Sequence, residues 1–271
     1  KKLMTKIIGI LNLTLDSFSD GGKYYDRDSA KKHVSAMIEE GADIIDLGAE
    51  STRSGFTDVD EDIQIKTLSP IIDFINSNHE IEISIDTRSS KVASAFTTSN
   101  VKYINDVSSG LHDSAMMDVV ASLGCKYIMT HMPPEHKKGK IKEFENILDE
   151  IKEYFDERID ACIKSGINRN NIIIDPGIGF GKSGKNNVLL LENIDFLHEV
   201  HEHVCIGSSN KRFSSELFKD VSTKEDLKIA NLVTFTTSAL SNVSFLRVHD
   251  VDLTKDVVLV VDKARSLMLR R

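Results

Sequence analysis

The chain has 271 residues, 40% of them hydrophobic and 28% charged, a composition that excludes disorder over most of its length. It carries 42 acidic and 34 basic residues, and the resulting net charge of −8 argues against nucleic acid or an anionic membrane as its main partner. Its three cysteines stand far apart and no apolar run approaches the roughly 20 residues of a membrane helix, so we expect a cytoplasmic protein.

Eight short apolar runs, rich in isoleucine and valine, recur along the chain. Runs of this kind are typical of strands that are buried on both faces in a parallel sheet. In chain order they span residues 7–11, 44–47, 81–85, 101–104, 127–129, 172–174, 204–206 and 245–248.

Segments of helical period lie between several of these runs. Their apolar residues recur every three or four positions, as on one face of an amphipathic helix. In the segment 144–163, for example, Ile151, Phe155, Ile159 and Ile163 share a face. The predicted helices span residues 28–40, 62–76, 144–163, 223–241 and 254–269.

This alternation predicts the fold class. Eight strands and about eight helices in a chain of this length are what an α/β protein with a single (β/α)8 TIM barrel requires, here over residues 1–271. A doubly wound open sheet is the alternative. It is weakened because no G-x-G-x-x-G pattern follows the first predicted strand.

Polar residues stand at or soon after the end of each predicted strand. In a barrel all strands end on one face, so we expect these side chains to surround one active site at the C-terminal mouth. They are Asn12, Asp46, Asp86, Asn105, Asp106, His131, Asp175, Ser208, Ser209, His249 and Asp250.

Two acids and an amide in this set suggest a ligand type. Asp86, Asn105 and Asp175 present hydrogen-bond acceptors, and the amide adds donors, a set that suits the aminopyrimidine edge of a flat heterocycle. The alternative for Asp86 is helix capping, because it precedes the segment Thr87-Arg88-Ser89-Ser90.

The segment 175–182, with three glycines at alternate positions, predicts a flexible loop in which Phe180 forms an aromatic wall. It is not a phosphate-binding loop of the G-x-x-x-x-G-K-[ST] type, because Pro176 stands where the first glycine would be. A plain turn is the alternative interpretation.

Positive groups follow several strands, with Arg53 after the second and Lys211 after the seventh. Arg247 and His249 stand two residues apart at the eighth strand, so they face the same side and predict an anion site for a phosphate or diphosphate. The alternative is a salt bridge at the barrel end between Arg247 and an aspartate such as Asp250.

Two long stretches resemble the signature motifs of dihydropteroate synthases. Residues 8–22, IGILNLTLDSFSDGG, resemble the first signature, and residues 41–53, GADIIDLGAESTR, resemble the second. Shorter matches follow in the family's order at 85–87, 104–106, 175–177, 180–182 and 247–251. The resemblance runs from about Ile7 to the end of the chain.

The resemblance implies a pterin-binding barrel that acts as a transferase in folate biosynthesis. Such an enzyme condenses 6-hydroxymethyl-7,8-dihydropterin diphosphate with p-aminobenzoate to give 7,8-dihydropteroate and pyrophosphate. The carbon–oxygen bond breaks first, diphosphate leaves with Mg2+ as cofactor, and the arylamine then attacks. A homodimer is also implied, because dimers are common in this family.

The same resemblance assigns roles to residues around the pterin. Asp86, Asn105 and Asp175 would hold its edge, with Lys211 beside the ring, and Asp86, Asp175 and Lys211 are the candidate catalytic residues. Asp175 can also favour the cation that forms when the carbon–oxygen bond breaks.

The diphosphate and the second substrate have their own implied residues. Asn12 would contribute to the Mg2+–diphosphate site, where Arg247 and His249 would bind the diphosphate. The residues implied for p-aminobenzoate and for the rest of the substrate site are Thr52, Arg53, Phe180, Gly207, Ser209 and Arg212.

The chain departs from the family pattern at four positions. Leu15 and Ser54 stand where proline is common, and a serine in place of proline is expected to loosen the second loop. Asn210 removes a usual cation, and Arg212 stands where a hydroxyl is usual. These changes bear on the affinity for p-aminobenzoate and its sulfonamide mimics more than on the pterin site.

Two further functions remain open. A methyltetrahydrofolate methyltransferase domain would share the pterin acceptors but would not need Asn12, Arg247 and His249 for diphosphate. A non-catalytic pterin-binding paralogue would keep the fold and lose turnover, and Asn210 is the residue that keeps this possibility open.

Overall fold

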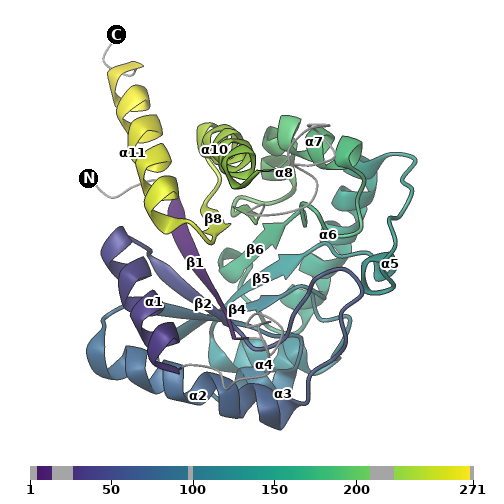
Figure 1. The fold of residues 1–271 in the computed structure, drawn as a ribbon. Helices are drawn as coiled ribbons and strands as arrows, with labels where there is room; N and C mark the ends of the chain where they lie inside the picture. Colours follow the sequence, from purple (N-terminus) through teal and green to yellow (C-terminus); the bar gives the residue numbers. More distant parts are fainter. Residues whose placement is uncertain (1–4, 14–26, 97–99, 208–222, 269–271) are drawn as a thin grey trace.

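The computed structural model describes residues 5–13, 27–96, 100–207 and 223–268. Its eight strands are parallel and form one sheet in the order β6-β5-β4-β3-β2-β1-β8-β7 (Figure 1). A further parallel bridge between Ile174 of β6 and Val204, next to β7, joins the two ends of the sheet. The sheet is therefore a closed barrel, which confirms the predicted fold and excludes the open-sheet alternative.

All eight predicted strands are present within two residues of their predicted ends. Isoleucine dominates them because each strand is covered by helices outside and by other strands' side chains inside. The strands are β1 Lys6–Asn12, β2 Ile44–Gly48, β3 Glu82–Asp86, β4 Val101–Asp106, β5 Lys126–Thr130, β6 Ile172–Asp175, β7 Cys205–Ile206 and β8 Phe245–Val248.

Helices connect the strands and cover the outside of the barrel (Figure 1). The five predicted helices are confirmed as α1 Arg27–Glu40, α2 Glu61–Asn78, α6 Ile147–Lys164, α10 Lys224–Leu240 and α11 Val251–Met268. The prediction for α6 was wrong at one residue, since Ile163 is 45% exposed and Cys162 takes its place in the core. The helices and helical turn that sequence patterns did not locate are α3 Ser90–Ser94, α4 Met116–Leu123, α5 Pro134–Lys137, η2 Arg169–Asn171, α7 Gly184–Glu192 and α8 Ile194–Val200.

The barrel interior is filled by layers of side chains. Its lower layer is a separate cluster of buried residues, one from each strand except β3: Ile8, Ile44, Tyr103, Ile128, Ile173, Cys205 and Phe245. Because strand side chains alternate between faces, the residues two positions further along each strand point into the same interior. This alternation carries polar side chains to the C-terminal end of the barrel, above an apolar floor.

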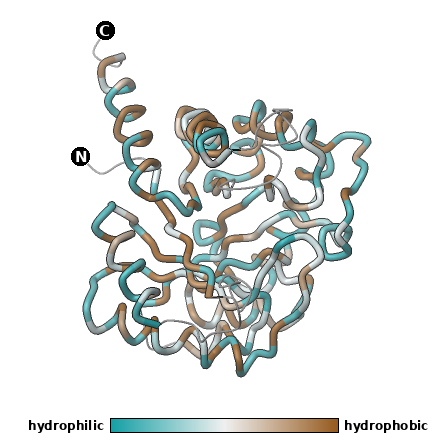
Figure 2. Tube along the Cα trace, viewed as in Figure 1, coloured by the Kyte–Doolittle hydropathy of each residue, from teal (hydrophilic) through white to brown (hydrophobic). Residues whose placement is uncertain are grey.

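The hydrophobic core outside the barrel lies between the strands and the helices. Figure 2 shows the strands as largely hydrophobic tubes, whereas hydrophobic and hydrophilic residues alternate along α11. Within the described ranges, no helix combines the length and the apolar character needed to cross a membrane. That the whole chain from 1 to 271 forms a single domain stays a prediction.

Candidate active site

The upper layer of the barrel interior is polar. Two positions beyond residues of the apolar floor, the strands place Asp46, Asn105, Thr130, Asp175, Gly207 and Arg247 in the interior. Asp86 of β3 pairs with Asn105 and lies at the same level. Asn12 ends β1 in the same phase as Ile8 and is half-buried. The structure thus brings Asp86, Asn105, Asp175 and Arg247 to one mouth, as predicted. The prediction was wrong for Asp106 and His131: Asp106 lies on the other face of β4, where its carboxylate accepts hydrogen bonds from Ser108, Gly110 and Tyr127, and His131 lines a cavity beside the mouth.

Arg247 is the centre of this layer. Its Nε atom donates to Oδ2 of Asp46 at 2.7 Å, and its Nη2 atom donates to Oδ2 of Asp86 at 2.7 Å. Nη2 also forms an ion pair with Oδ2 of Asp46 at 2.6 Å. A barrel-end salt bridge is therefore present, but its partners are Asp46 and Asp86. Asp250, the partner considered from the sequence, accepts the backbone N–H of Leu253 in the first turn of α11 instead.

Asp86 does not cap a helix. The N-cap of α3 is Ser89, whose hydroxyl oxygen accepts the backbone N–H of Val92. Asp86 is 6% exposed, and this burial raises its pKa to about 7, although the nearby Arg247 opposes the shift. A carboxyl group that titrates near neutral pH inside a cleft is characteristic of a functional site.

Asp46 was among the polar residues expected at the mouth, but the sequence analysis gave it no individual role. It is fully buried in the middle of β2, and besides Arg247 it accepts a hydrogen bond from the Nδ2 atom of Asn105 at 3.3 Å. Its Oδ1 atom has no hydrogen-bond partner. The signal that identifies it is its spacing of two residues from Ile44, which places both side chains in the barrel interior.

Asp175 stands across the mouth at the end of β6. Its Oδ1 atom accepts the backbone N–H of Gly177 at 2.8 Å. Gly207 packs close to its other oxygen, because a Cβ atom at position 207 would lie 3.2 Å from Oδ2 of Asp175. Gly207 therefore leaves room beside Asp175 and Arg247.

The loop after Asp175 is held in place by hydrogen bonds of a buried lysine, which differs from the flexible loop that its glycines predicted. Lys182 is buried, and its ammonium group donates to the carbonyl oxygens of His131, Gly177 and Phe180 at 2.9, 3.0 and 3.2 Å. Gly177 has a φ of +69°, and a Cβ atom there would lie 2.2 Å from the carbonyl oxygen of His131, so only glycine fits.

Two of the residues implied for p-aminobenzoate lie on either side of His136 in α5. Its Nε2 atom is 2.9 Å from the carbonyl oxygen of Thr52, and its ring lies edge-on to Phe180 with centroids 4.9 Å apart. Arg53 is exposed on the same β2–α2 loop. His249 is half-buried directly after β8, two residues from Arg247.

Three predicted site residues lie outside the described residues. They are Ser209, Lys211 and Arg212; Ser208 of the expected mouth and the departures at Leu15 and Asn210 lie outside them as well. Their roles stay predictions.

A cavity of about 460 Å³ lies beside the mouth and not in it. Arg88, His112, His131 and Lys137 are among its lining residues, which come from the connections after β3, β4 and β5. None of the interior carboxylates lines it, so this cavity is distinct from the site formed at the strand ends.

The closed barrel and its acidic mouth agree with a known family. Residues 8–249 match the family described as pterin binding enzyme. The fold and the site together thus define a pterin-binding enzyme of the barrel class.

Individual relatives give a closer assignment. The dihydropteroate synthase of Clostridium beijerinckii is 36% identical over 247 residues, which cover 91% of this chain and 89% of the relative. That of Mycobacterium leprae is 33% identical over 262 residues, covering 94% and 92%. The chain belongs to the dihydropteroate synthase family, which confirms the resemblance seen in the motifs.

Solved structures agree with this assignment. The Yersinia pestis dihydropteroate synthase in a sulfonamide drug complex superposes with a TM-score of 0.89 at 29% identity, covering 97% of this chain and 94% of that one. The Xanthomonas albilineans dihydropteroate synthase with 4-aminobenzoic acid has a TM-score of 0.88 at 33% identity, covering 96% and 93%.

Proposed function

We propose that the chain condenses 6-hydroxymethyl-7,8-dihydropterin diphosphate with p-aminobenzoate, forming 7,8-dihydropteroate and pyrophosphate in folate biosynthesis. The observation that carries this proposal is the convergence of Asp46, Asp86, Asn105 and Arg247 in one barrel mouth, in a chain whose relatives are dihydropteroate synthases. Each of these relatives is a synthase, which favours this activity over a methyltransferase.

Asp86, Asn105 and Asp175 are proposed to bind the pterin. Its ring N–H and exocyclic amino groups need acceptors, and a carboxylate supplies them without offering a competing donor. The apolar floor of Ile8, Ile128 and neighbouring residues gives a flat ring a surface to lie on.

The chemical step is proposed to need no protein nucleophile. The bond between the pterin methylene carbon and the diphosphate oxygen breaks, and its electron pair leaves with the diphosphate. The positive charge spreads into the pterin ring, where the carboxylate of Asp175 stabilises it. The arylamine nitrogen then donates its lone pair to the methylene carbon and loses a proton. Arg247 and His249 are proposed to bind the departing diphosphate.

Mg2+ is proposed as the cofactor, and the residues present fit it. Asn12 offers a neutral amide oxygen at the mouth, and Mg2+ accepts few protein oxygens together with phosphate oxygens and water. The described part of the chain contains no group of three or more His, Cys, Asp or Glu side chains that could hold a metal, so the ion would be shared with the diphosphate. When bound, it neutralises charge on the leaving group.

The second substrate is proposed to bind between the β2–α2 loop and Phe180. Thr52 and Phe180 are already linked through His136, and Arg53 supplies an exposed cation for the carboxylate of p-aminobenzoate. Ser209, Lys211 and Arg212 would complete this pocket. Sulfonamides, one of which is bound in the Yersinia pestis structure, are expected to compete for it.

A homodimer is also proposed, on an apolar surface formed by α10 and α11. The two helices lie against each other, since the Arg265 side chain donates to the carbonyl oxygens of Ala239 and Leu240. Contiguous exposed apolar residues are typical of a protein interface. The exposed apolar residues of this α10–α11 surface are Ile229, Val233, Leu240, Leu259, Val260 and Leu267.

The double substitution of Val233→Glu and Val260→Glu is expected to convert a dimer into a monomer, because two charges would be buried in the interface without partners. Light scattering after size-exclusion chromatography measures the mass. Ile63→Glu, an equally exposed apolar position on α2, is the control and should stay dimeric. A wild-type chain with the mass of a monomer would contradict the proposed dimer.

The proposed activity is tested by incubating the purified chain with both substrates and Mg2+. We expect dihydropteroate and pyrophosphate to form in equal amounts, and chelation of the metal to stop the reaction. Pterin binding without any product would instead identify a non-catalytic pterin-binding paralogue. A cytoplasmic location, expected from the cysteine content, stays a prediction.

A further inference from the structure

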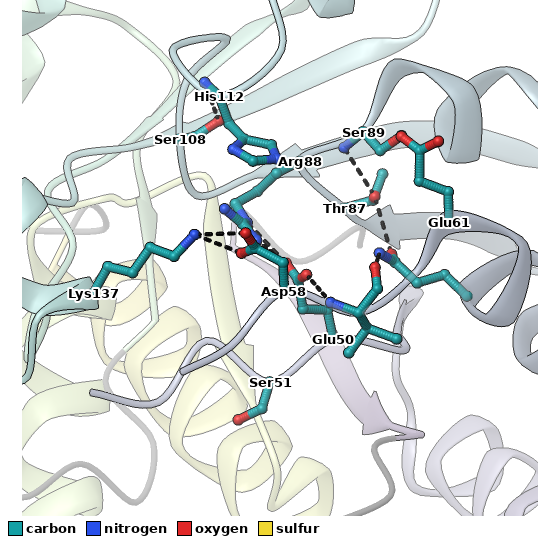
Figure 3. Close-up of polar contacts among 12 residues, drawn as sticks. Glu50, Ser51, Asp58, Glu61, Thr87, Arg88, Ser89, Ser108, His112 and Lys137 are labelled. Carbon is teal, nitrogen blue, oxygen red and sulfur yellow. Dashed lines mark hydrogen bonds and ion pairs between the residues drawn. The ribbon is translucent and has the colours of Figure 1, made fainter. Parts of the chain in front are cut away.

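Arg88 stands two residues after Asp86, but its side chain serves a different part of the molecule. It points to the β2–α2 loop, residues 49–60, where its guanidinium group lies between Glu50 and Asp58 (Figure 3). The Arg88 side chain is only 5% exposed. Neither the chemistry proposed above nor the family motifs assigned it a role.

The contacts of Arg88 join the beginning of this loop to its end. Its Nε and Nη2 atoms donate to Oε2 of Glu50 at 2.8 and 2.5 Å, and Nη2 donates to Oδ1 of Asp58 at 2.7 Å. The other oxygen of Glu50 accepts the backbone N–H of Val59 at 3.0 Å. One guanidinium group therefore joins the residue just before Ser51 to the residues that end the loop.

The enclosed part of the loop is the part proposed to bind p-aminobenzoate. Thr52 and Arg53 follow Glu50 in the chain, and Ser51 points away from the ion-pair network in Figure 3. Phe56 is the buried apolar residue of this segment, and the Arg88 guanidinium carbon lies 4.8 Å from the centre of its ring. Arg88 thus supplies both the ionic and the aromatic contact that holds the segment in place.

Helix α5 supports the same loop from the other side. The Lys137 ammonium group donates to both oxygens of Asp58, at 2.6 and 2.8 Å. The carbonyl oxygen of His136 accepts the backbone N–H of Gly55 at 3.1 Å. The hydrogen bonds of Lys137 and then Arg88 lower the pKa of Asp58 to about 2, so this carboxylate stays ionised over the whole working range.

The network explains how the loop is held without proline. Ser54 lacks the restricted φ of a proline, so the backbone of this segment has more freedom to lose on ordering. The contacts of Arg88 and Lys137 offset the entropic cost of ordering this backbone. Lys137 is half-exposed and contacts Asp58 and the ring of Phe56, whereas Arg88 is buried and reaches both ends of the loop.

We propose that Arg88 is a positioning residue for the second substrate: it holds the β2–α2 loop in the conformation in which Thr52 and Arg53 bind p-aminobenzoate. This inference rests on the proposed synthase activity. Arg88 touches neither substrate, and it acts through Glu50 and Asp58.

The test is steady-state kinetics of Arg88→Met with each substrate varied in turn. The KM for p-aminobenzoate is expected to rise about 10- to 100-fold, because displacing a binding group by about 1 Å has effects of this size. The KM for the pterin diphosphate should stay within about twofold. Arg88→Lys, which keeps the charge but loses the fork that spans both carboxylates, should give an intermediate rise.

A second variant separates positioning from stability. Arg88→Met leaves the buried Glu50 without its cation and is expected to be less stable, whereas adding Glu50→Gln removes that buried charge and keeps an acceptor for Val59. The double variant should recover stability and still show the raised KM for p-aminobenzoate. Lys91→Met, which removes an exposed cation that pairs with α2, is the control and should leave both KM values unchanged.

The two proposals fail in different ways. An unchanged KM for p-aminobenzoate in a folded Arg88→Met enzyme, or recovery of a normal KM in the double variant, would overturn the positioning role and leave the synthase activity standing. A wild-type chain that forms no dihydropteroate would overturn the synthase activity and this inference together. Faster amide hydrogen exchange of residues 49–60 in Arg88→Met would support the positioning role independently of turnover.

Discussion

Asp86→Asn is expected to weaken pterin binding by at least about 100-fold. The pterin edge presents N–H donors, and the amide would turn an NH2 donor toward them in place of an acceptor. Hydrogen bonds to a charged group contribute about 1.5–3 kcal/mol each, so losing two of them gives an effect of this size. Titration calorimetry with the dihydropterin alcohol measures the loss directly.

The same carboxyl group should make binding depend on pH. Its raised pKa of about 7 means that Asp86 is protonated below neutral pH and then carries a proton where the pterin needs an acceptor. Affinity should therefore fall as the pH is lowered from 8 to 6, approaching tenfold per pH unit below the pKa, and Asp86→Asn should abolish this dependence. Asp73→Asn, an exposed aspartate on α2, is the matched control. Full affinity in Asp86→Asn would remove Asp86 from the pterin site.

Arg247→Met is expected to be the most destabilising change in the mouth. It leaves Asp46 fully buried and Asp86 nearly so, without the cation they share. Breaking a buried ion pair in this way costs about 3–5 kcal/mol of unfolding free energy. The loss, measured by urea denaturation, should be largest at pH 8 and smaller at pH 5, where Asp86 is protonated.

Adding Asp46→Asn to Arg247→Met should recover part of that stability, because it removes one of the unpaired buried charges. Arg158→Met, which breaks a pair with the exposed Glu157, is the control and should cost no more than about 1 kcal/mol. In the stabilised double variant, affinity for the pterin diphosphate should fall far more than affinity for the pterin alcohol. An equal loss for both ligands would show that Arg247 does not recognise the anion.

The barrel could be predicted because its strands are simple in sequence. Runs such as 7–11 and 172–174 are continuously apolar, since helices cover one face and other strands the opposite face. The short helices could not be located in the same way. The five residues of α3, for example, do not complete two turns and show no periodicity.

The polar mouth was predicted in part. Asp86, Asn105, Asp175 and Arg247 stand at or near strand ends, where a barrel fold makes polar residues converge. Asp46 was expected at the mouth as well, but its pairing with Arg247 was not predicted, because the two residues stand 201 positions apart in the chain. Its role follows from the direction of its side chain, which only the strand phase determines.

Contacts between distant loops could not be predicted from the sequence. The partner of Asp58 is Lys137, 79 residues away, and Arg88 could not be assigned to Glu50 without knowing how the β2–α2 loop folds. The order of the loop after β6 was not predicted either. Its glycines indicated flexibility, but the buried Lys182 holds it through hydrogen bonds to the carbonyl oxygens of His131 and Gly177.

A crystal structure of the chain soaked with 6-hydroxymethyl-7,8-dihydropterin tests the central claim most directly. We predict that the ring lies in the barrel mouth, with its amino edge hydrogen-bonded to Asp86, Asn105 and Asp175. A ring bound in the lateral cavity beside Arg88 and His112, with the mouth empty, would contradict the account.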